Sequence, residues 1–216
     1  MPVIPIDVTA ETVFNMSRVL LNDVNIQLWS DTVLMPMMYQ AHLELQQKLK
    51  ARASPVMKGY AYVTVDQYET FFPPGGGPVD LTMPIFMWER PYGSTVEFQP
   101  MTEAGILPFL APGTNPNLIW WSWIQDTVQF VGASLIVEAV LLYWRRVPVP
   151  TVASDLIGII DGEQYLAPRI AAIAAASVGE VETATQASTL AESQLNVVLS
   201  ANKSRSPQVI ATSFRP

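Results

Sequence analysis

The spacing of apolar residues predicts a short helix within the first 28 residues. Thr9 or Thr12 is suited to cap its start, because a threonine hydroxyl accepts a hydrogen bond from an unpaired amide of the first turn. We expect this helix to end near Asn22 and Asp23. Its apolar positions are Val13, Val19 and Leu20.

A longer helix is predicted after Ser30, which with Asp31 is typical of an N-cap. Pro36 permits two interpretations, because proline has no amide to donate inside a helix. The helix either begins at Met35 with the proline in its first turn, or is kinked at the proline. The apolar positions at helical spacing are Leu34, Met38, Ala41, Leu45 and Leu49.

From residue 55 to residue 147, alternation of apolar and polar positions replaces the helical period. Three consecutive glycines in the segment 72–78 favour a turn over a phosphate cradle, since no Lys-Ser or Lys-Thr follows them. The predicted strands are 59–68, 83–89, 95–100, 118–124, 127–131 and 136–146.

Helical spacing returns after Pro150. One helix is predicted over 167–177, with Pro168 in its first turn, and a second over 180–201. The second helix has a narrow stripe of small apolar residues, which favours packing against another helix. The stripe consists of Ala184, Ala187, Ala191, Leu195, Val198 and Leu199.

These elements predict an α+β protein. We expect the N- and C-terminal helices to pack together as a helical bundle, with a central antiparallel β-rich insert. The expected domains are a helical bundle of residues 1–54 and 148–202, a β-rich insert of residues 55–147, and a C-terminal tail of residues 203–216.

Composition adds an expectation about assembly. Half of the 216 residues are hydrophobic and only 14% are charged, whereas soluble domains average roughly 25% charged residues. The chain has no run of about 20 apolar residues that could span a bilayer, and Glu138 interrupts the best candidate. We therefore expect an obligate oligomer whose subunits bury the apolar surplus. The net charge of −7 argues against a basic nucleic-acid reader.

Candidate chemistry is sparse. The absence of cysteine excludes disulfides, thiolate metal sites and cysteine nucleophiles, and the single histidine, His42, is expected to have a packing or surface role. Asp155, Asp161 and Glu163 are close enough in sequence to suggest a cation site or an acid–base pair, but capping and solvated roles are favoured. We expect no catalytic residue, no metal and no cofactor.

Two groups in the β-rich section invite other interpretations. Glu89 and Arg90 end a predicted strand and could form a buried ion pair. Trp121 and Trp123 share one face of their strand, with Trp120 on the other. Packing within a sheet is favoured over a base-stacking platform, because single-strand binding also needs a basic groove.

Six short motifs occur in order between Val19 and Ala201. They are Val19-Leu20-Leu21-Asn22-Asp23, Trp29-Ser30-Asp31, and the segments 84–94, 98–101, 130–133 and 142–145. Together they resemble the head-to-tail adaptor proteins, also called connector or neck proteins, of tailed bacteriophages.

The resemblance implies a non-enzymatic virion protein. It implies a ring, commonly a dodecamer, that binds beneath the portal protein, extends the DNA channel and provides the attachment site for a tail or nozzle protein. Viral assembly would take place in the host cytoplasm and leave the protein in the neck of the virion. The genomic DNA would pass without sequence-specific binding, and no membrane would be involved.

The resemblance also suggests that the C-terminal tail binds the portal. The implied apolar anchors are Val209, Ile210 and Phe214, and the implied charge partners are Arg205 and Arg215. Two alternatives remain open: another neck or tail component, such as a stopper or tail-tube protein, and a cell-wall hydrolase that uses the carboxylates of Asp155, Asp161 or Glu163.

Overall fold

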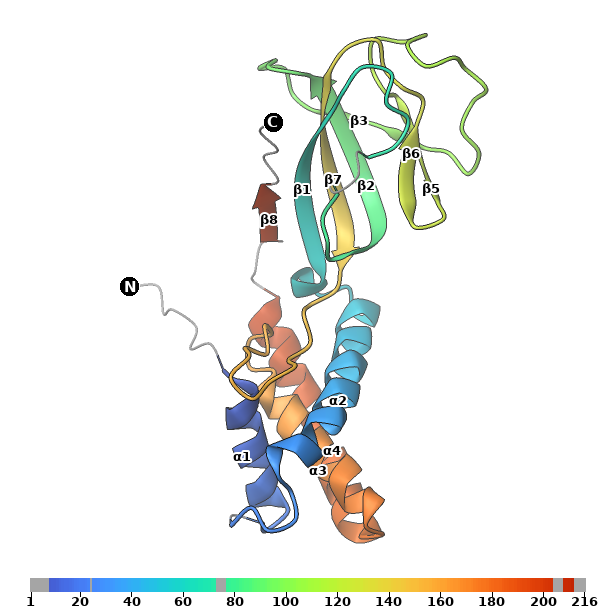
Figure 1. Ribbon diagram of the computed structural model, residues 1–216. Helices are drawn as coiled ribbons and strands as arrows, with labels where there is room; N and C mark the ends of the chain where they lie inside the picture. The colour runs from blue at the N-terminus through green and yellow to red at the C-terminus, as the bar shows by residue number, and fades with distance from the viewer. Residues whose placement is uncertain (1–7, 24, 73–76, 204–207, 212–216) are drawn as a thin grey trace. The chain divides into compact units, whose positions relative to one another are not determined.

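The computed structural model describes residues 8–23, 25–72, 77–203 and 208–211 (Figure 1). The chain divides into two compact units. The first, called here the helical unit, consists of Met1–Val56 and Val147–Ser206. The second, the β unit, consists of Met57–Arg146 and Pro207–Pro216.

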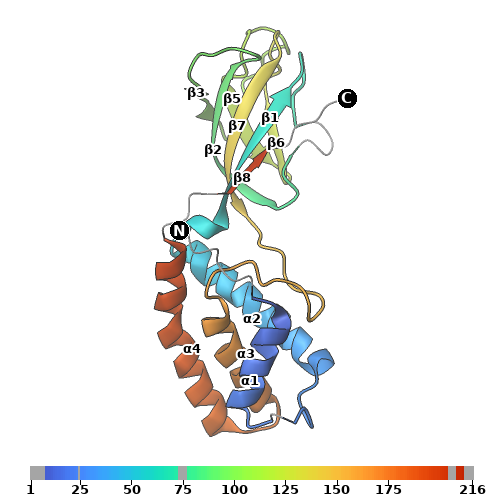
Figure 2. The ribbon, with the colours of Figure 1, turned by 90° about the vertical axis from the view of Figure 1, so that its left-hand side faces the viewer.

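The helical unit contains α1 (Ala10–Leu20), α2 (Asp31–Ala51), α3 (Glu163–Ser177) and α4 (Val181–Asn202). The alanine-rich α3 packs against each of the other three helices, and α4 packs mainly against α3 (Figure 2). Two ion pairs tie α2 to its neighbours: Arg169 of α3 holds both carboxylate oxygens of Glu44, at 2.6 and 3.1 Å, and Lys48 pairs with Glu192 of α4.

Local signals place the helix ends. The side chain of Thr9 caps α1 by accepting a hydrogen bond from the amide of Thr12 at 3.4 Å. Ser30 is the N-cap of α2, although its side chain makes no capping bond. The helix α2 runs from Asp31 straight through Pro36, and α3 begins before Pro168, so both prolines lie inside their helices instead of in a first turn.

The β unit contains two sheets. A short 3-10 turn, η1 (Pro55–Met57), spans the boundary between the units and precedes the first strand. The larger sheet has the order β3-β2-β7-β1-β8, formed by β1 (Lys58–Val65), β2 (Leu81–Pro91), β3 (Gln99–Pro100), β7 (Val137–Arg145) and β8 (Gln208–Ala211). The smaller sheet has the order β4-β5-β6, formed by β4 (Thr102–Glu103), β5 (Trp120–Ile124) and β6 (Thr127–Phe130).

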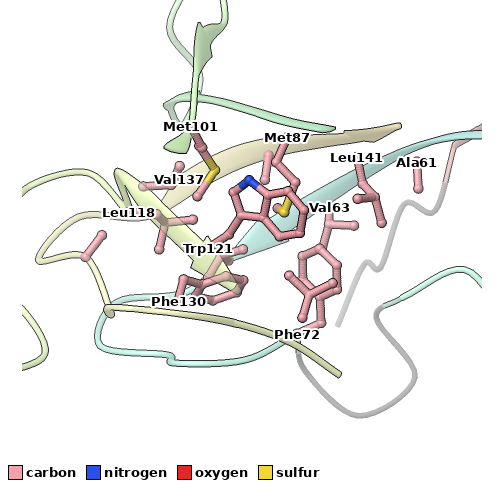
Figure 3. Packing of buried hydrophobic residues seen from close by; sticks show 14 of the residues in the cluster. Ala61, Val63, Phe72, Met87, Met101, Leu118, Trp121, Phe130, Val137 and Leu141 are labelled. Atoms are coloured by element: carbon pink, nitrogen blue, oxygen red, sulfur yellow. The ribbon is translucent and has the colours of Figure 1, made fainter. Parts of the chain in front are cut away.

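The core of the β unit lies on the inner face of the larger sheet, where β5 and β6 contribute Trp121 and Phe130 (Figure 3). Alternate residues of each strand supply this core because successive side chains point to opposite faces. Gly59 is required on the same face: an added Cβ would lie 2.6 Å from the ring of Tyr143, its partner on β7. The hydroxyl of Tyr143 donates a hydrogen bond to Asp80 at 2.8 Å.

The predicted architecture, a helical bundle with one central antiparallel β-rich insert, is wrong. The helices form no clear four-way bundle, because the narrow apolar stripe of α4 packs mainly against α3. The strands form two sheets, and two pairs, β1 with β8 and β4 with β5, are parallel. Moreover, β8 follows the last helix, so the β structure is not confined to the centre of the chain.

Candidate interaction surfaces

The outer face of the larger sheet carries a continuous group of aromatic and apolar side chains. The strand register defines it in four rows across β2, β7 and β1. The rows are Met83–Trp144–Lys58, Phe86–Leu142–Tyr60, Trp88–Val140–Tyr62 and Arg90–Glu138–Thr64. We call this set the aromatic face.

Side chains within the aromatic face pack on one another. The rings of Phe86 and Trp88 are 4.7 Å apart, and those of Trp88 and Tyr60 are 6.5 Å apart. Cations lie at the two ends. The Nζ atom of Lys58 is 5.3 Å from the centre of the Trp144 ring. Arg90 lies over the ring of Phe98 and pairs with Glu138. These contacts hold the face in one conformation before any partner arrives, which lowers the entropy cost of binding.

A partner is needed to cover this face completely. Tyr62 remains 46% exposed, Met83 44% and Phe86 40%. The ring of Phe98, from the segment before β3, contacts that of Tyr62 with centroids 6.2 Å apart, so the uncovered part of the face is centred on Met83 and Phe86. The smaller sheet covers the opposite side of the larger sheet. A contiguous exposed apolar surface of this kind marks an interaction site.

The helical unit also exposes individual apolar side chains near the ends of its helices. Val19 and Leu28 are exposed near the connection from α1 to α2, and Val178 and Val181 near the turn from α3 to α4. Val181 is 74% exposed. In the part of the chain that the structure describes, no helix is long and apolar enough to cross a membrane.

The exposed side of α4 is poor in charge. Its hydroxyl groups are already bonded to the helix itself: Thr185 donates to the carbonyl of Val181 at 2.8 Å, and Thr189 donates to the carbonyl of Thr185 at 2.9 Å. Because these hydroxyls are satisfied, another helix could cover this side without leaving buried donors unpaired.

His42 lies in a buried polar network. Of the two roles that the sequence predicted, packing and surface, it therefore has the first. The Nε2 atom of His42 is 2.9 Å from the carbonyl oxygen of Ile157, and its Nδ1 atom is 2.9 Å from the side-chain nitrogen of Gln46. A carbonyl only accepts and an amide nitrogen only donates, so the imidazole is neutral with its proton on Nε2. Gln46 also exchanges two hydrogen bonds with the backbone of Val147.

We predict that this network weakens in mild acid. Burial lowers the pKa of His42 below 6.5, although its bond to Ile157 acts in the opposite direction. Below pH 6.5 the unfolded chain therefore binds a proton that the folded chain refuses. Stability should fall from about pH 6.5 down to the lowered pKa, by at most about 1.4 kcal/mol per pH unit.

Because His42 is the single histidine, its titration can be followed directly by NMR and compared with urea unfolding at each pH. The variant His42→Gln should lose the pH dependence between pH 5.5 and 6.5. A measured histidine pKa at or above 6.5 would contradict the prediction.

Asp23 organises the connection between α1 and α2. Its carboxylate accepts hydrogen bonds from the backbone amides of Gln27 at 2.9 Å, Leu28 at 3.1 Å and Trp29 at 2.8 Å. Burial alone would raise the pKa of Asp23, but the three amides outweigh it and hold the pKa below its usual value. The carboxylate thus remains charged and fixes the loop.

Arg18 holds the same connection from the other side. Its Nε donates to the carbonyl of Trp29 at 2.7 Å, its Nη1 donates to Asn15 at 2.9 Å, and its Nη2 pairs with Asp31 at the start of α2. The side chain is almost completely buried. Arg18 and Asp23 therefore explain why the motif residues around Asp23 and Trp29 occur together, which the sequence patterns did not predict.

The predicted ion pair between Glu89 and Arg90 is wrong, because neighbouring residues of a strand face opposite sides of the sheet. Glu89 points into the core and accepts hydrogen bonds from the backbone amides of Leu118 at 2.6 Å and Ile119 at 2.8 Å. Burial raises the pKa of Glu89 despite those two amides. Arg90 instead pairs with Glu138 on the aromatic face, at 2.6 Å.

The tryptophans lie as predicted. Trp121 is buried in the core, and Trp123 packs against the same core from the same face of β5. The side chain of Trp121 faces that of its partner Phe130 on β6. These residues serve packing between strands.

The three predicted carboxylates do not come together as a site in the described residues. Asp155 accepts hydrogen bonds from the amide and hydroxyl of Thr151 and from the amide of Val152, and these bonds lower its pKa. Asp161 adopts a positive φ of 52° just before α3, and Glu163 lies in the first turn of α3. Within the described ranges, no three acidic or histidine side chains gather as metal ligands.

Two clefts open on the β unit. One, of about 530 Å³, is lined in part by Leu81, Trp123 and Asp126, and the other, of about 290 Å³, by residues such as Phe71 and Leu110. Asp126 is the single acidic side chain among the described residues that line them. A paired-carboxylate mechanism requires two acids across a cleft, which these two clefts do not present.

The predicted portal-binding residues lie partly outside the described residues. Arg205, Phe214 and Arg215 fall there. The backbone of Val209 and Ile210 belongs to β8 and pairs in parallel with Tyr60 and Ala61 of β1. Their role in binding a portal stays a prediction. The glycine-rich segment 73–76 also lies outside the described residues.

Comparison with known proteins gives no family for this chain. No protein-family model matches the sequence, and no curated protein matches it either.

Proposed function

We propose that this protein is a structural head-to-tail adaptor of a tailed bacteriophage. In this proposal, copies of the chain form a ring under the portal, extend the DNA channel and provide the attachment site for the tail. The observation that carries the proposal is that each unit of the chain exposes apolar side chains. They are those of the aromatic face in the β unit, and Val19, Leu28, Val178 and Val181 in the helical unit.

A ring requires this kind of chain. In a closed ring with head-to-tail contacts, each copy meets its neighbours through two different surfaces, so a single self-complementary patch is not sufficient. We assign the aromatic face to the contact with the neighbouring copy. Its central aromatic rings, with the charged side chains confined to the two end rows, are typical of an interface with an apolar core and a polar rim.

Charge supports the channel role. With −7 per chain, a ring of about twelve copies is strongly acidic, and an acidic lumen does not bind phosphates through counterion release. DNA can therefore pass without being retained. The motif resemblance between Val19 and Ala201 supplies the specific identification as an adaptor.

The proposal is tested by negative-stain imaging of the purified protein mixed with the portal protein of the same virus. A ring of this protein added beneath the portal ring is the expected result. Portal particles that look the same with and without this protein would contradict it. Hexamers or tubes formed without the portal would instead favour a stopper or tail-tube component.

A further inference from the structure

The strand β8 joins the β unit through its backbone pairing with β1, and the same pairing could be made between two copies of the chain. It follows α4 after five residues, Lys203 to Pro207, and its four residues pair with β1 at the edge of the larger sheet. The register pairs Gln208 with Gly59 and Ala211 with Tyr62. Without β8, β1 would be an open edge, which is a ready template for another strand.

The described core of the β unit comes from residues that precede β8 in the chain. Its side chains belong to residues between Ala61 and Tyr143, all of which precede α3 and α4. The backbone pairing of β8 with β1 adds a strand at the edge of this sheet. An edge strand can be exchanged between identical chains while the same backbone hydrogen bonds are formed.

Rotational symmetry permits the exchanged pairing. In a cyclic ring every copy is related to the next by rotation about one axis, and this rotation leaves the sense of each strand along the axis unchanged. The parallel pair of β8 and β1 can therefore also be made between neighbouring copies. The five residues from Lys203 to Pro207 limit the reach of β8 from the end of α4 to about 18 Å.

We propose that in the assembled ring β8 of each copy pairs with β1 of the neighbouring copy, so that each subunit is bound to the next by an exchanged strand. This inference rests on the proposed ring. The exchanged pairing forms the same backbone hydrogen bonds as the pairing within one chain. The ring also holds the neighbour's β1 at a high effective concentration, which favours the exchange.

The absence of cysteine makes a clean cross-linking test possible. Two single variants are made, Tyr62→Cys and Ala211→Cys, whose positions are partners in the register. They are mixed before assembly, with the portal protein as a template if the ring needs one, then oxidised and analysed on a non-reducing gel. A covalent dimer that forms in this mixture, and not when either variant is oxidised alone, shows that β8 pairs between copies.

The double variant, with both cysteines in one chain, reports the pairing directly. Exchange predicts that the monomer band is lost and replaced by a ladder of linked chains up to the ring. A monomer band that has lost its free thiols, together with no dimer in the mixture, would show pairing within one chain and overturn the proposal. No linkage of either kind would also overturn it, since β8 would then lie elsewhere, for example on the portal.

A control and a truncation complete the experiment. Gln67→Cys, in the exposed turn after β1, mixed with Ala211→Cys should give no dimer. A chain that ends at Asn202 lacks β8 and should form at least tenfold less ring at the same concentration; unchanged ring formation would contradict the exchange. The reduced samples are sized in parallel. A ring that links only within chains refutes the exchange and leaves the adaptor proposal intact, whereas a reduced protein that forms no ring refutes both.

Discussion

The variant Phe86→Glu is expected to remain folded but to lose ring assembly. Phe86 lies in the middle of the aromatic face and is 40% exposed, so the new side chain can reach water in the free monomer. The cost in folding stability should be about 1 kcal/mol, mainly from the contact with Trp88. In a closed interface the same carboxylate would be buried without a partner, which costs several kcal/mol.

Each 1.4 kcal/mol corresponds to a tenfold change in affinity, so assembly should weaken by roughly 100-fold or more. The measurement is the mass distribution by light scattering across a concentration series, with circular dichroism to verify folding. Gln67→Glu is the matched control, because it adds the same charge at an exposed turn outside the aromatic face. If Phe86→Glu assembled like the unmodified protein, the aromatic face would not be a subunit contact.

The variant Asp23→Ala is expected to destabilise the helical unit by about 2–4 kcal/mol. Its carboxylate is bonded to three backbone amides, and hydrogen bonds to charged groups contribute roughly 1.5–3 kcal/mol each. Part of this loss is offset, because Leu28 is exposed and its amide can bind water in the variant. The amide of the buried Trp29 has no such replacement among the described contacts.

The melting temperature of the helical unit should fall by roughly 10 °C or more. The melting temperature of Asp23→Asn should lie between those of Asp23→Ala and the unmodified protein, since one acceptor oxygen remains. Asp66→Ala, at an exposed carboxylate, should change the melting temperature little. Equal melting temperatures for Asp23→Ala and Asp66→Ala would show that the loop amides do not depend on Asp23.

The sequence was informative about local elements. Alternation predicted strands at 59–68 and 136–146; β7 lies within the second range, and β1 begins one residue before the first. The helical period likewise located α4, because its stripe of Ala187, Ala191 and Leu195 faces α3. The period of two also placed Trp121 and Trp123 on one face of β5. Such patterns are set by each strand or helix alone.

The pairing of elements was beyond these patterns. A four-residue strand such as β8 has too few positions to show alternation, and its direction against β1 depends on the whole chain path. One proline misled for a related reason: Pro168 was expected in the first turn of its helix but lies inside α3. Of the two interpretations of Pro36, the structure has a helix that begins after Ser30 and contains the proline, because a helix packed against α3 tolerates one lost backbone bond. Tertiary packing decided both outcomes.

The polar residues that hold the connection between α1 and α2 were also missed. Asp23 was taken to mark only the end of the first helix, because a carboxylate that accepts from amides four to six residues ahead leaves no periodic signal. The structure shows that Trp29 links Arg18 and Asp23, since its carbonyl accepts from Arg18 and its amide donates to Asp23.

The most direct test of the adaptor proposal is the mass of the purified protein, alone and after mixing with the portal protein, measured by light scattering. A ring is expected in at least one of these conditions, with a mass near 286 kDa for about twelve copies of the 23.8-kDa chain. When the portal is present, its own mass is added to this value. A protein that stays a 23.8-kDa monomer in both conditions would contradict the account.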